Sequence, residues 1–177
     1  MSRLYIPLLL VLIFVFEGVA YEFIPADITQ RDLFIIAHWT FVFLVLMALF
    51  YDMEYTYYSI LAAVIIGLMT DIAYTNIIGV YMFIYALVIY FIHGIRKLLH
   101  ANFFVAFLLT ILGVALVDMG ISFVYSFIGV NNMPLTGYMV YRLVPTLIAN
   151  AIAFIVFYII FKSRLVKWAT VRFDNKK

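Results

Sequence analysis

The sequence predicts an all-α membrane protein with six transmembrane helices, and three observations lead to this prediction. Hydrophobic residues make up 68% of the 177 residues and charged residues 11%, whereas a soluble domain has about 45–50% apolar and about 25% charged residues. The apolar residues are gathered in six runs, and Lys and Arg are concentrated in alternate connections and the chain end. We expect one domain, residues 1–177, without disulfides or thiolate metal sites because cysteine is absent.

The first two spans are expected at residues 4–21 and 33–51. A cleavable signal peptide is the alternative interpretation of the first run, because Arg3 precedes it and small residues end it, but Glu17 disturbs that pattern. The intervening residues read as a polar loop. The second span carries His38 close to its start.

The third and fourth spans are expected at residues 57–73 and 79–92. In the third, Ala63, Gly67 and Asp71 are spaced at four, which places two small residues and an acid on one helix face. Small residues at this spacing let two membrane helices approach closely. The fourth span is rich in Tyr, has no charge and leads into a basic loop.

The last two spans are expected at residues 103–127 and 138–161, followed by a basic tail at 162–177. The tail holds six Lys and Arg residues and is most simply a positively charged anchor on anionic lipid. A specific cytoplasmic partner of the tail is the alternative.

A polar stripe marks each of these last two spans. Arg142, Thr146 and Asn150 follow one another at intervals of four around Pro145, and a similar stripe begins at Asp118. Side chains at this spacing share one helix face. A buried polar group needs a partner, so neither stripe can face acyl chains and both are expected to face other helices.

The distribution of Lys and Arg predicts that both termini are cytoplasmic. With six spans the two ends share a side, and that side holds nine of the eleven Lys and Arg residues: Arg3, Arg96, Lys97, Lys162, Arg164, Lys167, Arg172, Lys176 and Lys177. The opposite connections hold only Arg31, and Arg142 lies within a span.

Five spans each carry one ionisable residue at a depth expected in the outer half of the membrane: Glu17, His38, Asp71, Asp118 and Arg142. Such charges cost about 2.5–3.5 kcal/mol each and usually face the bundle interior in pairs. One interpretation is a salt-bridged core in which Arg142 pairs with Asp118 or Asp71. The other is a polar pocket open to the outer face, because three carboxylates outnumber one arginine.

No catalytic, metal-ligand or phosphate-binding spacing is present, and we expect no enzyme activity, cofactor or nucleic-acid partner. The chain does resemble the MreD family of rod shape-determining membrane proteins. The resemblance covers essentially the whole chain. It rests on the size, the six spans, the run Gly67-Leu68-Met69-Thr70-Asp71 with Gly79 eight residues on, and the set Arg142, Pro145 and Asn150.

This resemblance implies a role in cell-wall elongation in a bacterial plasma membrane. It implies an MreC-like bitopic membrane partner, and an assembly with MreB filaments, a RodA-type glycosyltransferase and a class B penicillin-binding protein. The family also looks distantly similar to the substrate-binding subunits of energy-coupling-factor transporters.

Two functions follow, a membrane scaffold for wall synthesis and, as the alternative, a small-solute-binding transporter subunit that uses the outer polar pocket. Vitamin-binding subunits resemble one another in an Ala-x-x-x-Ala pair on the first helix. The corresponding run here, LYIPLLLVLIFVF, has neither Ala nor Gly. The close docking that such a pair permits is therefore absent, which favours the scaffold.

Overall fold

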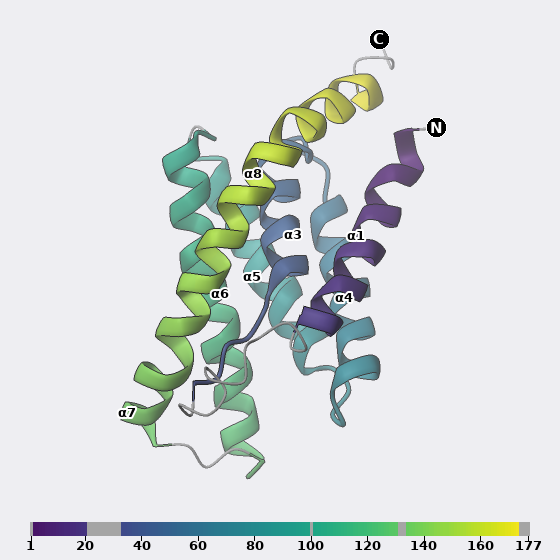
Figure 1. Ribbon diagram of the computed structural model, residues 1–177. Helices are drawn as coiled ribbons and strands as arrows, with labels where there is room; N and C mark the ends of the chain where they lie inside the picture. Colours follow the sequence, from purple (N-terminus) through teal and green to yellow (C-terminus); the bar gives the residue numbers. More distant parts are fainter. Residues whose placement is uncertain (1, 21–32, 100, 131–133, 174–177) are drawn as a thin grey trace.

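The computed structural model describes residues 2–20, 33–99, 101–130 and 134–173, and all regular structure within these ranges is helical. The helices pack side by side as a bundle, and the two ends of the chain lie at the same end of it (Figure 1). The fold is thus the predicted all-α, polytopic membrane fold.

The helices follow one another in chain order. They are α1 (Ser2–Val19), α3 (Trp39–Phe50), α4 (Tyr58–Tyr74), α5 (Val80–Arg96), α6 (Phe103–Phe127), and a last continuous helix made of α7 (Leu135–Gly137), the π-helical η2 (Tyr138–Leu143) and α8 (Val144–Phe173). Helices α6 and α7–η2–α8 are long and apolar enough to cross a membrane, and the other four are apolar but shorter.

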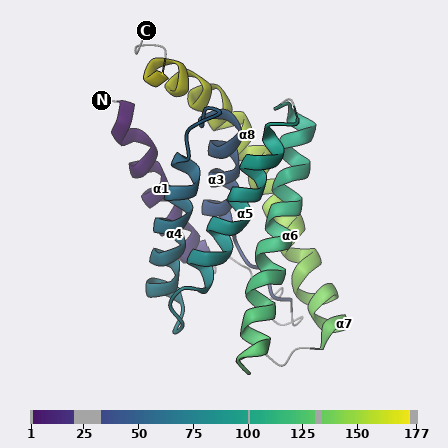
Figure 2. The same ribbon diagram turned by 180° about the vertical axis from the view of Figure 1, so that it is seen from behind.

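Helix α3 lies at the centre of the bundle, where the other helices surround it (Figures 1 and 2). It contacts α1, α4, α5, α6 and α8. Every residue from Thr40 to Leu49 is buried. A helix that is apolar on all sides is stable only when it is enclosed, and α3 is enclosed by protein.

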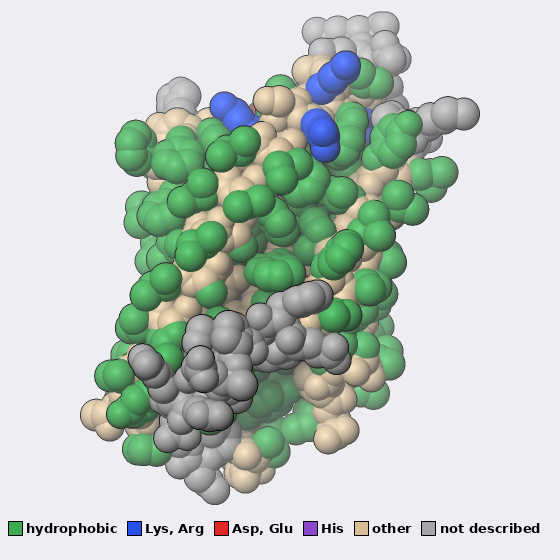
Figure 3. Space-filling model, viewed as in Figure 1, with side chains coloured by type: hydrophobic (Ala, Val, Ile, Leu, Met, Phe, Trp, Pro, Cys, Tyr) green, Lys and Arg blue, Asp and Glu red, His purple; other side chains and the backbone are tan. Residues whose placement is uncertain are grey.

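The outer surface of the bundle is apolar. Large aliphatic and aromatic side chains are exposed along every surrounding helix, for example Leu61 on α4, Phe83 on α5, Leu112 on α6 and Ile159 on α8. In Figure 3 such side chains cover the visible face, while Lys and Arg gather towards the end that holds the C-terminus. Lipid is the solvent that suits this surface.

The start of the second predicted span, 33–51, needs correction. Residues 33–38 are not helical, and α3 begins only at Trp39. The backbone of this stretch bonds to the last helix instead of to its own next turn. Non-helical backbone at membrane depth is tolerated only where protein supplies its hydrogen bonds.

Two other boundaries also differ from the sequence prediction. Helix α5 extends to Arg96, so the basic loop is shorter than expected. The last helix runs from Leu135 to Phe173, so the predicted tail is helical over its described part. Apolar and aromatic residues such as Leu165 and Trp168 continue the buried face beyond the predicted span, which explains the extension. The predicted polar loop at 22–32 and the chain end at 174–177 lie outside the described residues.

Candidate functional site

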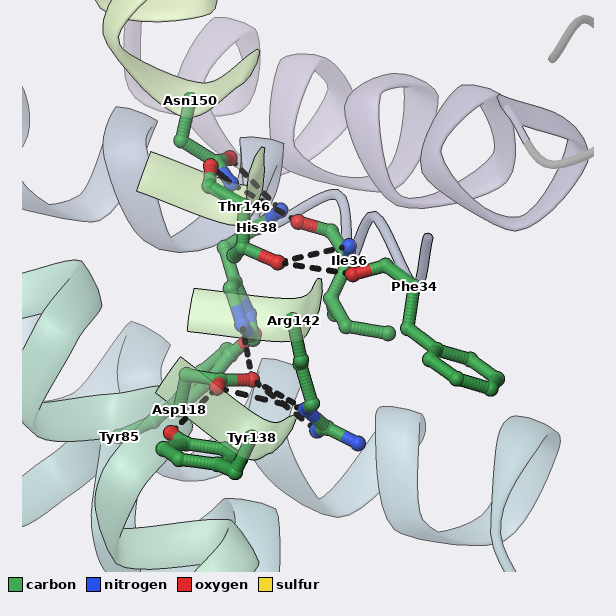
Figure 4. Close-up of polar contacts among 9 residues, drawn as sticks. All are labelled: Phe34, Ile36, His38, Tyr85, Asp118, Tyr138, Arg142, Thr146 and Asn150. Carbon is green, nitrogen blue, oxygen red and sulfur yellow. Dashed lines mark hydrogen bonds and ion pairs between the residues drawn. The ribbon is translucent and has the colours of Figure 1, made fainter. Parts of the chain in front are cut away.

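The non-helical segment 33–38 lies along the polar stripe of the last helix (Figure 4). Alternate residues of the segment bond to it. Phe34 N donates to Tyr141 O (2.8 Å), Ile36 N to Thr146 Oγ1 (3.1 Å) and His38 N to Asn150 Oδ1 (2.8 Å). In return, Thr146 Oγ1 donates to Phe34 O (3.4 Å) and Asn150 Nδ2 to Ile36 O (2.8 Å).

The two partners match in repeat distance. An extended chain advances about 6.6 Å in two residues, and a helix advances about 6 Å in four. Residues 34, 36 and 38 therefore keep step with a helical stripe of period four. This match explains why Thr146 and Asn150 can each serve both a backbone N–H and a backbone carbonyl.

Pro145 has a role in the same contact. A helical proline has no N–H to donate to the carbonyl four residues earlier, which here is that of Tyr141. That carbonyl accepts the N–H of Phe34 at 2.8 Å. The π-helical turn η2 ends at Leu143, two residues before Pro145, and π-helical turns are found mostly as single turns inserted in α-helices.

The buried carboxylate of Asp118 on α6 lies against η2, about one helical turn before Thr146 on the same face of the last helix. Arg142 donates to it from Nη2 (3.0 Å) and Nε (3.2 Å), and Tyr138 donates from its hydroxyl (2.6 Å). His38 Nε2 lies 3.7 Å from the same carboxylate, and His38 Nδ1 lies 3.2 Å from the hydroxyl of Tyr85 on α5. Asp118 and His38 together thereby link α6, η2, the segment before α3, and α5 (Figure 4).

Glu17, near the end of α1, caps the start of α3. Its Oε2 accepts the backbone N–H of Thr40 (2.7 Å) and the Thr40 hydroxyl (2.6 Å). The first N–H groups of a helix have no partner within the helix and carry partial positive charge. A carboxylate from another helix satisfies one of them here.

Asp71, near the end of α4, caps the start of α5 in the same way. Its carboxylate accepts the N–H groups of Gly79 (2.8 Å), Tyr81 (2.9 Å) and Met82 (3.1 Å). Gly79 has φ 106°, a conformation that favours glycine. A Cβ on Gly67 would lie 2.6 Å from the Met82 backbone, so this glycine permits the close approach of α4 and α5.

The profile of the family described as rod shape-determining protein MreD matches residues 2–167. The chain belongs to the MreD family. It is similar to the rod shape-determining protein MreD of Bacillus subtilis, with 26% identity over 162 residues, 92% of each chain. It is also similar to the cell shape-determining protein MreD of Streptococcus pneumoniae, with 30% identity over 121 residues, 68% of this chain and 74% of the relative.

No solved structure matches this MreD-family chain. The likeness to substrate-binding subunits of energy-coupling-factor transporters therefore stays a prediction. Family membership does establish that the protein is a membrane protein involved in determining cell shape.

The structure brings some of the predicted polar residues together and keeps others apart. The predicted contact between Arg142 and Asp118 is present, with His38 and Asn150 beside it. Glu17 and Asp71 lie at two other helix starts. Asp71, considered as a second partner of Arg142, bonds to the backbone of α5 instead, because three N–H groups converge there.

A pocket of about 420 Å³ lies beside Glu17, between α1, α4 and the start of α5, and is lined also by Ile36, Thr70, Tyr74 and Tyr81. It is the described cavity that comes nearest to the predicted outer polar pocket. Arg142, Asp118 and Asn150 do not line it.

Sequence reasoning missed Tyr138, Thr40 and Asp52. Tyr138 was read as the first residue of a span, although its spacing of four from Arg142 was available as a signal. Asp52 lies in the connection between the second and third predicted spans, where an acid gives no signal of burial, yet it is buried and its Oδ2 accepts the N–H of Ser59 (3.0 Å) near the start of α4. Burial raises the pKa of the Asp52 carboxyl, and the Ser59 bonds oppose this. Asp52 is thus a third carboxylate at a helix start.

Proposed function

We propose that this protein is a non-enzymatic scaffold of the bacterial cell-wall elongation machinery. In this proposal it helps to keep cells rod-shaped by binding an MreC-type bitopic protein and, through the resulting assembly, peptidoglycan synthases. The observation that carries the proposal is the match of residues 2–167 to a family whose relatives are named for determining rod and cell shape.

The polar geometry supports a positioning role. Glu17, Asp52 and Asp71 each bond to a helix start. Asp118 on α6 bonds to Tyr138 and Arg142 of the last helix and lies 3.7 Å from His38 of the non-helical segment. These groups set where helices begin and how they are oriented. A bundle defined in this way offers partners a fixed outer surface, which is the property that a scaffold requires.

Association with a single-span partner tests the proposal. The protein, tagged at its N-terminus, is co-expressed with the MreC-type protein of the same genome and purified in mild detergent. We expect the two to elute as one stable complex, and we expect an unrelated single-span protein to be absent from it. Separate elution under conditions that keep both proteins folded would contradict the proposal.

A shape assay provides an independent test. In a rod-shaped bacterium whose own MreD-family gene is deleted, expression of this protein together with its MreC-type partner should restore cell length and width. Rounded cells at normal membrane levels of both proteins would argue against a role in elongation in that host.

Both termini are proposed to be cytoplasmic in the plasma membrane. The concentration of Lys and Arg on the side of the chain ends supports this orientation. Tags at either terminus should resist protease added to intact cells, whereas a tag inserted at Asn132 should be digested. A C-terminal tag that is digested on intact cells would reverse the orientation.

A second candidate function is the binding of a small solute, and the 420 Å³ pocket beside Glu17 favours it. Against it, the oxygen Oε2 of Glu17 already accepts two hydrogen bonds from Thr40. A thermal-shift screen of small polar metabolites on the purified protein distinguishes the two functions. Saturable stabilisation that disappears in Tyr81→Phe, together with no partner complex, would favour solute binding.

A further inference from the structure

A second cavity lies at the other end of the bundle, between α1 and α4, and we refer to it as the α1–α4 cleft. It has a volume of about 210 Å³. Its walls are almost entirely aliphatic and include Ile6 and Leu10 of α1 and Leu61, Ile65 and Met69 of α4. Leu61 and Ile65 are also 58% and 50% exposed, so the cleft opens onto the lipid-facing surface of the bundle.

One end of the α1–α4 cleft is closed by a polar group, the guanidinium of Arg172 with Tyr51 and Tyr58. Arg172 donates to the Tyr51 hydroxyl, and its Cζ lies 4.0 Å from the ring centroid of Tyr58. The guanidinium is therefore held in place by stacking and by one hydrogen bond.

Arg172 has donors left for another partner. A guanidinium has five N–H donors and stays charged at physiological pH. Among the residues that the structure describes, each ion pair involves Arg142 or a histidine, and no carboxylate lies within 4.0 Å of Arg172. A fixed cation at one end of an apolar cleft, with no carboxylate of the described residues beside it, is complementary to an anion that carries a hydrocarbon chain.

We propose that the α1–α4 cleft holds one acyl chain of an anionic phospholipid whose phosphate binds Arg172. The location agrees with this occupant, because Arg172 lies near the end of the molecule where Lys and Arg gather (Figure 3) and where an anionic leaflet would be attracted. A transmembrane helix is about 10–12 Å across with its side chains, so a single 5.4 Å turn occupies roughly 400 Å³, which is more than the 210 Å³ of the cleft. The proposal differs from a general attraction of the basic tail to lipid, because it requires one saturable site.

Native mass spectrometry of the purified full chain tests the site. The protein is titrated with phosphatidylglycerol, and Arg172→Gln is compared with Lys167→Gln, which removes the same charge from an exposed position on the same helix. We expect one lipid to be retained by the unchanged protein and by Lys167→Gln. In Arg172→Gln we expect affinity to fall by about tenfold or more. Equal losses in both variants would overturn the proposal in favour of diffuse charge.

The apolar half of the site is tested separately. Ala62 lines the α1–α4 cleft, and Ala62→Phe should fill it and abolish the retained lipid while Arg172 is still present. The thermal unfolding temperature of this variant confirms that it is folded. Retention of one lipid by a folded Ala62→Phe protein would overturn the proposal.

A photo-crosslinking residue at Leu61 identifies the occupant in membranes. We expect an adduct of the mass of one phospholipid, and an adduct of protein size would overturn the proposal by assigning the cleft to a helix. All three measurements are independent of the scaffold function, because they need neither the MreC-type partner nor any shape assay.

Discussion

Helices α3 and α5 both begin at a buried carboxylate, but the two starts are held by different parts of the chain. The start of α5 is capped by Asp71, which lies only 8 to 11 residues from the N–H groups that it accepts. The start of α3 is capped by Glu17, 23 residues away, and the segment before it bonds to Thr146 and Asn150, more than 100 residues away.

This difference separates a local unit from one that depends on the whole fold. The α4–α5 hairpin contains its own cap, so it can complete its hydrogen bonds without the other helices. The start of α3 has a full set of bonds only after α1 and α8 have docked. Contacts distant in sequence form at a greater entropic cost, so we expect the start of α3 to be the less protected of the two.

The largest expected effect concerns the ion pair that fixes the last helix against α6. Arg142→Ala and Asp118→Ala each leave a buried charge without its partner, which costs about 3–5 kcal/mol. The double variant should recover part of the loss, and the exchange of the two charges should recover more. The four variants are compared by measuring the free energy of unfolding of each in detergent.

Amide hydrogen exchange extends this experiment to the comparison of the two helix starts. In Arg142→Ala, exchange should accelerate at Ile36 and His38, whose partners lie on the same helix as Arg142. It should change little at Tyr81 and Met82. Additive losses of Arg142→Ala and Asp118→Ala would argue against the pair, and equal acceleration at both helix starts would remove the distinction between them.

A smaller loss of stability is expected when a side chain of the polar stripe on the last helix is removed. Asn150→Ala removes the partners of His38 N–H and Ile36 C=O inside the bundle, and two unsatisfied backbone groups cost about 2–4 kcal/mol together. Asn102→Ala is the matched control. Asn102 caps α6 at an exposed position by accepting the N–H of Val105, and its loss should cost about 1 kcal/mol. Similar losses in both variants would mean that segment 33–38 finds other partners.

The same contrast explains what could be predicted from the sequence. The spacing of Ala63, Gly67 and Asp71 predicts that this helix approaches a neighbouring helix closely. The polar stripe at Arg142, Thr146 and Asn150 predicts that this face of the last helix turns towards the other helices. Depth and charge predicted that Arg142 pairs with Asp118 or Asp71, and the structure has the pair with Asp118. These signals depend on periodicity and on the cost of burying polar groups, which the sequence displays directly.

The identity of the stripe's partner could not be predicted in this way. Residues 33–38 are apolar enough to read as the first turns of a helix, and only the donors and acceptors of α8 make a non-helical conformation stable there. Likewise, the predicted spans contain three carboxylates against one arginine, but the sequence does not indicate that backbone N–H groups at helix starts serve as the other partners. Both facts depend on which elements pack together.

The third prediction concerns the stability lost when the carboxylate that caps α5, Asp71, or the one that caps α3, Glu17, is removed. Asp71→Ala leaves three N–H groups without an acceptor and should cost about 1–2 kcal/mol, with faster exchange confined to Tyr81 and Met82. Glu17→Ala leaves one N–H group and one hydroxyl, and should cost about 1 kcal/mol, with faster exchange at Thr40. Asp71→Asn keeps an acceptor oxygen and serves as the control. Faster exchange at His38 in Asp71→Ala would contradict the local character of the α5 cap.

The smallest effect is expected at Asp52, the third capping carboxylate, which lies in the turn before α4 and is local like Asp71. Burial raises the pKa of this carboxyl above its ordinary 3.8, so the folded state binds the proton more tightly than the unfolded state does. The stabilisation that follows is present at low pH and is lost as pH rises through the raised pKa. Asp52→Asn keeps an acceptor for the N–H and hydroxyl of Ser59 but cannot ionise.

The free energy of unfolding of the unchanged protein should therefore fall relative to that of Asp52→Asn as pH rises from about 4 towards neutrality. His93 Nδ1 lies 3.9 Å from Asp52 Oδ2, so the comparison is repeated in a His93→Gln background to remove its titration. If Asp52→Asn is less stable than the unchanged protein at every pH, the charge of Asp52 is needed for the α4 cap. In that case the cap would act on the helix dipole rather than through hydrogen bonding alone.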